Sequence, residues 1–326
     1  MNEVNTPKVS VVMSVYREPV EWLRQSIDSI LNQTFRDFEY IIICDSPDYN
    51  DGITLLKEYA SKDERIRLIF NESNIGLTKS LNKGLKIARG KYIARMDADD
   101  ISKSTRFEKQ ISYLDSHSEC IVCGTRVKYF GDIKWWKHPK SDWIRTEDEK
   151  NKGRLIIGSC FAHPSIIMRR LSPPQFYNEN IRRSQDYDMW TRIAELGQFH
   201  NIPDELLLYR VSPSQISSSS FNQYASNIRN NYLISIYKKC GIVIPDVEFQ
   251  LTPDFLLEKM DTVKHNQMIT ECERNNIIQL TYFVQSENRW GLFVRSLFWG
   301  DFFRFPFLDE IRFILIVLGL RESMKL

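Results

Sequence analysis

Short apolar runs alternate with segments of helical periodicity from Val9 to Met96, and this alternation limits the possible folds more than any other feature of the chain. Val9 to Val15 is an almost unbroken apolar run, as expected for a strand covered on both faces. The helical period then predicts a helix from Glu18 to Asn32. Further strands are expected at Tyr40 to Cys44, Ile66 to Phe70 and Lys91 to Met96. Because strands that alternate with helices form parallel sheets with right-handed crossovers, we expect an α/β, Rossmann-like half.

The helix before the fourth strand is expected to begin at Gly76 and to have Gly90 as its C-terminal cap. A helix is then expected from Ser104 to Ser116, with Thr105 and Glu108 at capping-box spacing. Later elements are expected to be the strands Cys120 to Val127, Ser165 to Met168 and Leu206 to Val211, and the helix Asp186 to Leu196. Together these predict a mostly parallel sheet with flanking helices.

Two polar stretches interrupt this pattern. Tyr129 to Arg154 carries Trp135, Trp136 and Trp143 and is expected to be a loop, either with a binding role or packed as a flap. Ser212 to Ser220 is rich in serine, and everything beyond it has a helical pattern. We therefore place a domain boundary there, with the sheet domain at residues 1–220 and a mainly helical region at 221–326.

The length of 326 residues also favours about two domains. The 44 basic residues nearly balance the 42 acidic ones, and a net charge of +2 gives no case for nucleic acid binding. Six unevenly spaced cysteines and a polar start from Met1 to Lys8 predict free thiols in a cytoplasmic protein. The spacing of Cys120, Cys123, Cys160 and His163 imitates a zinc site. However, residues an odd number apart on a strand face opposite sides, which weighs against zinc.

The stretch from Trp290 to Leu320 combines many aromatic residues with arginines. Its longest uncharged run, Phe313 to Leu320, is far too short to span a bilayer. Such a composition is typical of a helix lying in the membrane interface, although it also fits a helix docked on the protein core. Both interpretations stay open.

Three carboxylates, those of Asp97, Asp99 and Asp100, follow the fourth expected strand. Because residues two apart in an extended chain point the same way, Asp97 and Asp99 can face one point beyond the strand end. Open α/β sheets bind ligands at that edge. Two hard oxygen donors suit Mg²⁺ or Mn²⁺ bridging to a substrate phosphate. The alternative is a polar turn that caps the next helix.

The motifs around this acidic turn occur in a characteristic order. They are Val9-Ser-Val-Val-Met-Ser-Val-Tyr16-Arg-Glu18, Glu39-Tyr-Ile-Ile-Ile-Cys-Asp45, Asn74-Ile-Gly76-Leu-Thr-Lys-Ser-Leu-Asn82-Lys-Gly84 and Gly90-Lys-Tyr-Ile-Ala-Arg95-Met-Asp97-Ala-Asp99-Asp100. Downstream stand Gly158-Ser-Cys-Phe-Ala-His163-Pro-Ser165, Gln185-Asp186-Tyr-Asp188-Met-Trp190, Tyr209-Arg210 and Gln215-Ile-Ser217. Over residues 8 to 220 the chain closely resembles family 2 glycosyltransferases, which are inverting nucleotide-sugar enzymes of the GT-A fold.

The resemblance implies a role for each matching residue. Tyr16 would stack on the nucleotide base, and Asp45 would accept its imide N–H. Asp97 would approach the ribose or the sugar, and Asp99 would carry the metal. Asp186 would be the general base. The donor side as a whole would comprise Tyr16, Glu18, Asp45, Asn74, Gly76, Lys79, Asn82, Arg95, Asp97 and Arg210. The acceptor side would comprise His163, Gln185, Trp135 and Trp136.

The chain departs from the family pattern at three places. Gln185 stands where a glutamate usually precedes the base, and Ser212 stands where a histidine often follows the Tyr-Arg pair. The stretch Asp45-Ser-Pro-Asp48 replaces the usual Asp-Asp-Gly-Ser. These changes leave the metal pair and the base in place.

We therefore expect a metal-dependent inverting glycosyltransferase that uses Mn²⁺ or Mg²⁺. The resemblance implies a UDP-sugar donor first and a dTDP-sugar second. It also implies a saccharide or lipid-linked acceptor in surface polysaccharide or lipopolysaccharide synthesis, at the inner face of the membrane. A non-catalytic nucleotide-sugar or glycan-binding module is the alternative that Gln185 and Ser212 favour. A Mg²⁺-dependent phosphohydrolase is weaker, because it would leave Tyr16, Asp45 and Asp186 unexplained.

Overall fold

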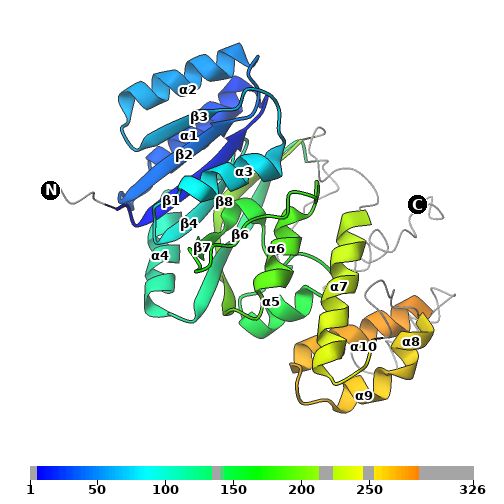
Figure 1. Cartoon of the computed structure of the whole chain (residues 1–326). Helices are drawn as coiled ribbons and strands as arrows, with labels where there is room; N and C mark the ends of the chain where they lie inside the picture. The colour runs from blue at the N-terminus through cyan, green and yellow to red at the C-terminus, as the bar shows by residue number, and fades with distance from the viewer. Residues whose placement is uncertain (1–5, 134–140, 142, 213–222, 245–252, 286–326) are drawn as a thin grey trace. The chain divides into compact units, whose positions relative to one another are not determined.

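The computed structural model describes residues 6–133, 141, 143–212, 223–244 and 253–285. These residues form two compact units, shown as a ribbon in Figure 1. The first takes its residues from within 1–146 and 161–218, and the second from within 147–160 and 219–326. The expected features at Trp135, Trp136, Ser217 and the stretch from Trp290 to Leu320 lie outside the described residues.

The first unit is built around an eight-stranded sheet in the order β3-β2-β1-β4-β7-β6-β8-β5. Strands β1 to β4 and the pair β6–β8 are parallel, whereas β7 and β5 run antiparallel to their neighbours. The strands are β1 (Val9–Val15), β2 (Phe38–Cys44), β3 (Ile66–Phe70), β4 (Tyr92–Asp97), β5 (Ile101–Ser102), β6 (Cys120–Gly131), β7 (Ile167–Arg169) and β8 (Gln198–Val211). The helices are α1 (Val20–Leu31), α2 (Asn50–Lys62), α3 (Leu77–Ile87), α4 (Arg106–Ser116) and α6 (Gln185–Ile193), with a 3₁₀ turn at His163–Ser165. The predicted α/β class with a mostly parallel sheet is confirmed.

The central strands are buried on both faces, as their apolar sequences predict. Every residue of β1 and of β2 is buried. The register pairs Val15 with Cys44 and Ser14 with Asp97. Because these strands are parallel, the chain leaves β1, β2 and β4 at the same edge of the sheet. Tyr16, Asp45 and the acidic turn therefore belong to one edge.

Gly76 and Gly90 both occupy positions that require glycine, but Gly90 has a different role from the predicted helix cap. Gly76 precedes α3 with φ = 87°, a left-handed conformation that suits glycine. Gly90 does not cap α3, because the helix ends at Ile87 and Ala88 is its cap residue. A Cβ at Gly90 would lie 2.5 Å from the backbone nitrogen of Ser10, so glycine lets this segment approach β1.

The expected capping box at the start of α4 is also absent. Thr105 makes no side-chain capping bond, and Glu108 instead accepts a 2.8 Å hydrogen bond from Thr34 Oγ1. The expected loop from Tyr129 to Arg154 is partly regular, because β6 continues to Gly131 and α5 covers Asp148–Arg154. β8 begins at Gln198, eight residues before the predicted strand, because β6 pairs with this polar stretch as well. Tertiary pairing thus extends strands beyond their apolar cores.

In the second unit the described elements are all helices, namely α5, α7 (Gln223–Lys239), α8 (Pro253–Glu258), α9 (Met260–His265) and α10 (Glu271–Gln285). A reciprocal capping box opens α10. Thr270 N–H donates to Glu273 Oε2 over 2.9 Å, and Glu273 N–H donates to Thr270 Oγ1 over 3.1 Å.

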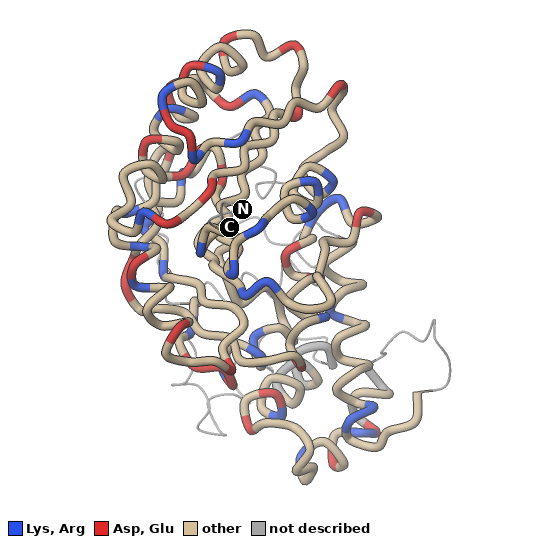
Figure 2. Tube along the Cα trace, turned by 60° about the vertical axis from the view of Figure 1, so that its left-hand side comes forward, with Lys and Arg blue, Asp and Glu red and all other residues tan. Residues whose placement is uncertain are grey.

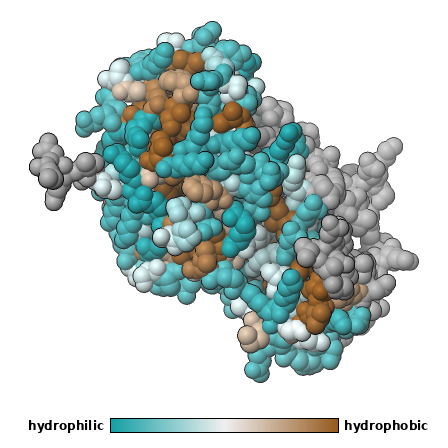
Figure 3. Space-filling view, in the orientation of Figure 1, coloured by the Kyte–Doolittle hydropathy of each residue, from teal (hydrophilic) through white to brown (hydrophobic). Residues whose placement is uncertain are grey.

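The described surface is mixed in character. Basic and acidic residues are intermingled along the traced chain in Figure 2. On the face shown in Figure 3, hydrophilic residues cover most of the described area, with brown hydrophobic patches between them. All six cysteines are free. Among the described residues, no helix combines the length and the apolar character needed to cross a membrane.

Candidate active site

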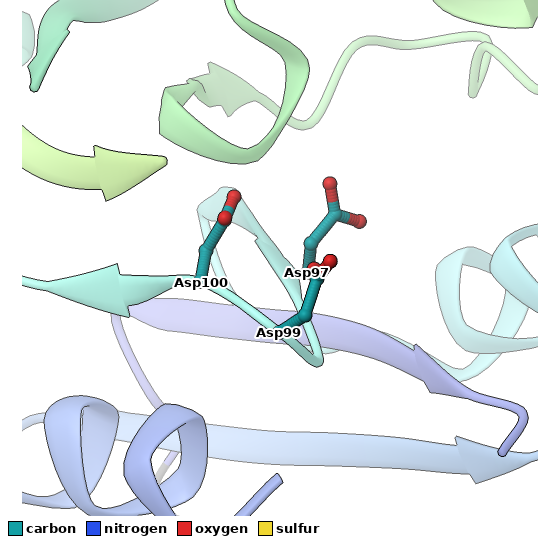
Figure 4. Close-up of side chains that lie close together, drawn as sticks. All are labelled: Asp97, Asp99 and Asp100. Atoms are coloured by element: carbon teal, nitrogen blue, oxygen red, sulfur yellow. The ribbon is translucent and has the colours of Figure 1, made fainter. Parts of the chain in front are cut away.

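The acidic turn after β4 gathers three carboxylates. Asp97 ends β4, and Asp99 and Asp100 follow it before β5. One carboxylate oxygen from each lies within 4.8 Å of the others, and the three side chains project from the same turn in Figure 4. Within the described part of the chain, no other group of three His, Cys, Asp or Glu side chains is arranged to hold a metal ion. The predicted metal pair therefore has a third member, Asp100, which is only 1% exposed.

Arg210 of β8 fixes the acidic turn. Its backbone N–H donates to Asp100 Oδ1 over 2.8 Å, and its Nε donates to the Asp99 carbonyl over 2.7 Å. Nη2 donates to Gln25 Oε1 over 2.7 Å. Two rings lie 4.6 and 4.4 Å from the guanidinium carbon, those of Trp22 and Phe130. The sequence interpretation placed Arg210 against a phosphate, whereas these bonds of its guanidinium hold the turn.

Asp97 is held from its own strand and from α1. Arg95 on β4 forms an ion pair with the Asp97 carboxylate. Ser26 Oγ on α1 donates to the Asp97 carbonyl over 2.8 Å. The guanidinium of Arg95 is buried, and its Nε and Nη1 have no hydrogen-bond partner among the described residues. Arg95 thus places a positive charge beside the acidic turn from within the protein.

The electrostatics of the turn fit a bound cation. Burial, and after it the charge of Asp97, raises the pKa of Asp99 to about 6. Burial and the charges of Asp97 and Asp99 raise the pKa of Asp100 well above its ordinary value. The buried Oδ2 of Asp100 has no partner in the described chain. A divalent cation would offset this repulsion, and the hard carboxylate oxygens suit Mg²⁺ or Mn²⁺.

Tyr16 and its neighbours form the end of β1. Tyr16 is 46% exposed, and its backbone N–H donates to Glu18 Oε2 over 2.9 Å. Arg17 Nε donates to Ser46 Oγ over 3.1 Å, and its guanidinium pairs with Asp48. Burial, and to a smaller extent the charges of the acidic turn, raises the pKa of Glu18 to about 7. The exposed tyrosine ring and the half-buried Glu18 therefore stand at the same edge as the acidic turn.

Asp45 at the end of β2 is a buried acceptor for donors of its own chain. Its Oδ1 accepts hydrogen bonds from Asn71 Nδ2 over 2.8 Å and from Ile75 N–H over 2.9 Å. Its Oδ2 accepts one from Gly76 N–H over 2.8 Å. The Asn74 side chain also accepts from Gly76 N–H, over 2.9 Å. Asp45 thereby shapes the loop that leads into α3, and Oδ2 keeps room for one more donor.

The opposite side of the site is formed by His163, Tyr177 and α6. His163 Nε2 lies 2.7 Å from the Tyr177 hydroxyl, and the His163 ring lies 6.2 Å from that of Trp190. Burial raises the pKa of Tyr177, the charge of Arg95 opposes this rise, and the charges of Asp186 and Asp97 add to it. The contacts of His163 therefore connect Tyr177 with α6, the helix that carries Asp186.

The other predicted residues fall on α3 and α6. Lys79 is exposed on α3, and Gln185 is buried at the first position of α6. Asn82 is predicted to contact the donor, but its amide bonds to Tyr177 and Glu179. Asp186 follows Gln185 in the first turn of α6, where the helix dipole favours an anion.

Residues 10–173 match the model of glycosyl transferase family 2. The chain belongs to this family. An uncharacterised glycosyltransferase of Methanocaldococcus jannaschii, MJ1057, is 38% identical over 242 residues, which are 73% of this chain and 80% of the relative. The O-antigen biosynthesis glycosyltransferase WbnJ of Escherichia coli is 32% identical over 259 residues, which are 72% of this chain and 96% of the relative. The resemblance that the sequence motifs indicated is confirmed.

Solved structures agree with this glycosyltransferase fold. The structure of S. aureus TarS 1-349 in complex with UDP-GlcNAc has a TM-score of 0.55 at 15% identity and covers 84% of this chain and 90% of that one. The mannosyltransferase PcManGT from Pyrobaculum calidifontis, in complex with GDP-Man and Mn²⁺, has a TM-score of 0.52 at 12% identity. It covers 95% of this chain and 84% of that one. At 15% and 12% identity, the likeness to these two structures shows only that the chain has the GT-A fold.

Two residues of the glycosyltransferase site were missed as site residues by sequence reasoning. Asp100 was visible as the third carboxylate of the turn, but the strand alternation singled out Asp97 and Asp99. Tyr177 carries no motif, and it reaches the site through a loop that packs on α3 and α6. No local pattern in the sequence could have identified it.

Proposed function

We propose that this protein is a metal-dependent inverting glycosyltransferase, which transfers a sugar from a nucleoside diphosphate to a saccharide hydroxyl. The observation that carries the proposal is the cluster of three carboxylates, those of Asp97, Asp99 and Asp100, in a chain of glycosyl transferase family 2. Asp186 lies separately in the first turn of α6. The cluster suits the diphosphate through a metal ion, and Asp186 suits the attacking hydroxyl.

Asp186 would act as the general base. A carboxylate can accept the acceptor's proton as the oxygen attacks the anomeric carbon. The attack comes from the face opposite the leaving diphosphate, which inverts the configuration. Because such a weak base gives little driving force, positioning must supply much of the rate.

The acidic turn would hold Mn²⁺ or Mg²⁺ through Asp97, Asp99 and Asp100. A bound ion supplies charge neutralisation at the departing diphosphate. Arg95 and Arg210 keep the turn in shape, and Tyr16 offers an exposed ring to the nucleotide base. Asp45 Oδ2 offers one acceptor position at the same edge.

A UDP-sugar is our first choice of donor. A carboxylate acceptor at the base pocket suits the imide N–H of uracil, and thymine offers the same group, so dTDP comes second. The TarS neighbour holds UDP-GlcNAc, and the PcManGT neighbour holds GDP-Man with Mn²⁺. The name of WbnJ supports an acceptor in surface polysaccharide synthesis.

Thermal stabilisation tests the donor class first. We would measure the melting temperature with UDP, dTDP, GDP and CMP, each with Mn²⁺ and with a chelator. A nucleotide at 100 times its Kd adds about 2.7 kcal/mol, which is easily resolved. Stabilisation by UDP that requires Mn²⁺ would support the proposal. Stabilisation by GDP alone would contradict the base pocket, and a nucleotide effect that is independent of metal would contradict the role of the acidic turn.

Asp186→Asn tests the base. We expect loss of sugar transfer with unchanged nucleotide affinity, because the substitution keeps the size and removes the proton acceptor. Asp188→Asn is the matched control, since Asp188 lies on the same helix and pairs with Arg192. Unchanged transfer by the Asp186 variant would rule out its role as base. Nucleotide binding by a native protein that transfers no sugar would favour the binding-module alternative.

A further inference from the structure

Four hydrogen bonds hold the stretch from Tyr177 to Ile181 to α3. Asn82 Nδ2 donates to the Tyr177 carbonyl over 2.9 Å, and Tyr177 N–H donates to Asn82 Oδ1 over 2.9 Å. The Asn82 amide thus pairs with both backbone groups of one residue, as a neighbouring strand would. Asn82 Nδ2 also donates to Glu179 Oε1 over 3.0 Å, and Thr78 Oγ1 donates to the Ile181 carbonyl over 3.2 Å.

These bonds engage both N–H groups of the Asn82 amide. The amide oxygen also accepts one hydrogen bond, and the residue is only 2% exposed. This amide could donate to a nucleotide only if one of its two N–H bonds broke. The geometry therefore assigns Asn82 to the protein's own loop.

Phe176, the residue before this stretch, is held to α6. Arg192 Nη2 on α6 donates to the Phe176 carbonyl over 2.8 Å. The Tyr177 side chain reaches His163, whose Nε2 lies 2.7 Å from the hydroxyl. The His163 ring contacts Trp190, which lies four residues after Asp186 and so on the same face of α6. Tyr177 is thus the link between α3, His163 and the helix that carries Asp186.

We propose that Asn82 is a positioning residue, which clamps the backbone of Tyr177 so that the tyrosine hydroxyl holds His163 beside the helix of Asp186. This inference rests on the proposed function and deepens it on the acceptor side. Burial raises the pKa of Tyr177 and lowers that of His163, so both side chains are neutral near pH 7. The 2.7 Å hydrogen bond between Nε2 and the hydroxyl then holds the neutral imidazole in one orientation and one tautomer.

Asn82→Ala and Tyr177→Phe are the test variants. We expect the Asn82 variant to lose about 10²-fold in kcat/KM for the acceptor, because a shift of the order of 1 Å near the reacting groups has that effect. The Kd for UDP with Mn²⁺ should change less than twofold, since no donor contact is lost. Tyr177→Phe, which leaves the clamp intact but removes the hydroxyl that it positions, should show the same split with a loss at least as large.

Asn201→Ala is the matched control. Asn201 is also a fully buried amide, and its Nδ2 donates to the Arg145 carbonyl over 2.8 Å, in the same unit. It should lower the melting temperature and leave the acceptor KM unchanged. Equal loss of acceptor kcat/KM in Asn82→Ala and Asn201→Ala would overturn the proposal. So would a tenfold weaker UDP affinity with unchanged kcat in Asn82→Ala, which would make Asn82 a donor ligand.

A spectroscopic measurement separates this inference from the proposed function. Ring ¹⁵N NMR of histidine-labelled protein, with His163→Gln to assign the signal, should show a single neutral tautomer of His163. Both Asn82→Ala and Tyr177→Phe should shift His163 toward a mixture of tautomers. An unchanged His163 signal in Asn82→Ala, with a changed one in Tyr177→Phe, would overturn the clamp. If the native protein transfers no sugar while these shifts are seen, the proposed function fails and the clamp stands.

Discussion

Replacing Arg210 by methionine should destabilise the first unit strongly. The substitution removes hydrogen bonds to the Asp99 carbonyl and to Gln25 Oε1, both 2.7 Å long. Hydrogen bonds from a charged donor contribute about 1.5–3 kcal/mol each, and the two ring contacts add about 0.5–1 kcal/mol each. Since methionine keeps part of the packing and such terms are not additive, we expect a loss of about 3–5 kcal/mol in the free energy of unfolding.

For a unit of this size, that loss corresponds to a melting temperature lower by roughly 6–20 °C. Differential scanning calorimetry of the full chain would measure it. Arg210→Lys should give a smaller fall, because lysine keeps the charge but not the planar group that donates in two directions. Arg24→Met is the control, as the Arg24 side chain is half-exposed on α1 and lies 3.9 Å from Glu21. A fall below about 2 °C in Arg210→Met, with tenfold weaker nucleotide binding, would refute the clamp and favour a phosphate contact.

Three further predictions concern other parts of the molecule. The pKa of Glu18 rises from 4.5 to about 7 on folding, so the native state binds the extra proton and stability should fall as the pH rises from 4.5 to 7. Glu18→Gln should reduce this fall of the melting temperature with pH. An unchanged pH dependence in the variant would contradict the raised pKa. Gly90→Ala should lower the free energy of unfolding in urea by about 1–3 kcal/mol, because its Cβ would lie 2.5 Å from the backbone nitrogen of Ser10. An unchanged free energy of unfolding would show that the backbone of β1 can move to make room for the Cβ. Deleting the residues after Trp290 should move the protein from the membrane to the soluble fraction, and unchanged fractionation would count against an interfacial segment.

The residues at the sheet edge could be predicted from the sequence because parallel strands impose their own geometry. Once β1, β2 and β4 are recognised as neighbouring parallel strands, the residues that follow them must meet at one edge. The observed pairs Val15 with Cys44 and Ser14 with Asp97 fulfil this expectation. The strand β8 was predicted too short for the opposite reason. Its first half is polar, and only pairing with β6, far away in the sequence, makes it a strand.

Side-chain roles were harder to predict than side-chain positions. Arg210 and Asn82 both lie near the site, as the motifs implied, yet both use their polar groups to hold the chain. A long or branched polar side chain bonds to the nearest buried group that lacks a partner, since leaving such a group unsatisfied costs about 1–3 kcal/mol. Which group that is depends on loops such as the one that carries Tyr177, and their paths are set by tertiary contacts. Motifs therefore locate the residues of a site, whereas hydrogen-bond saturation decides which of them remain available to a substrate. By that criterion Asp99, Asp100 and the exposed Tyr16 are available, whereas both N–H groups of Asn82 are already engaged.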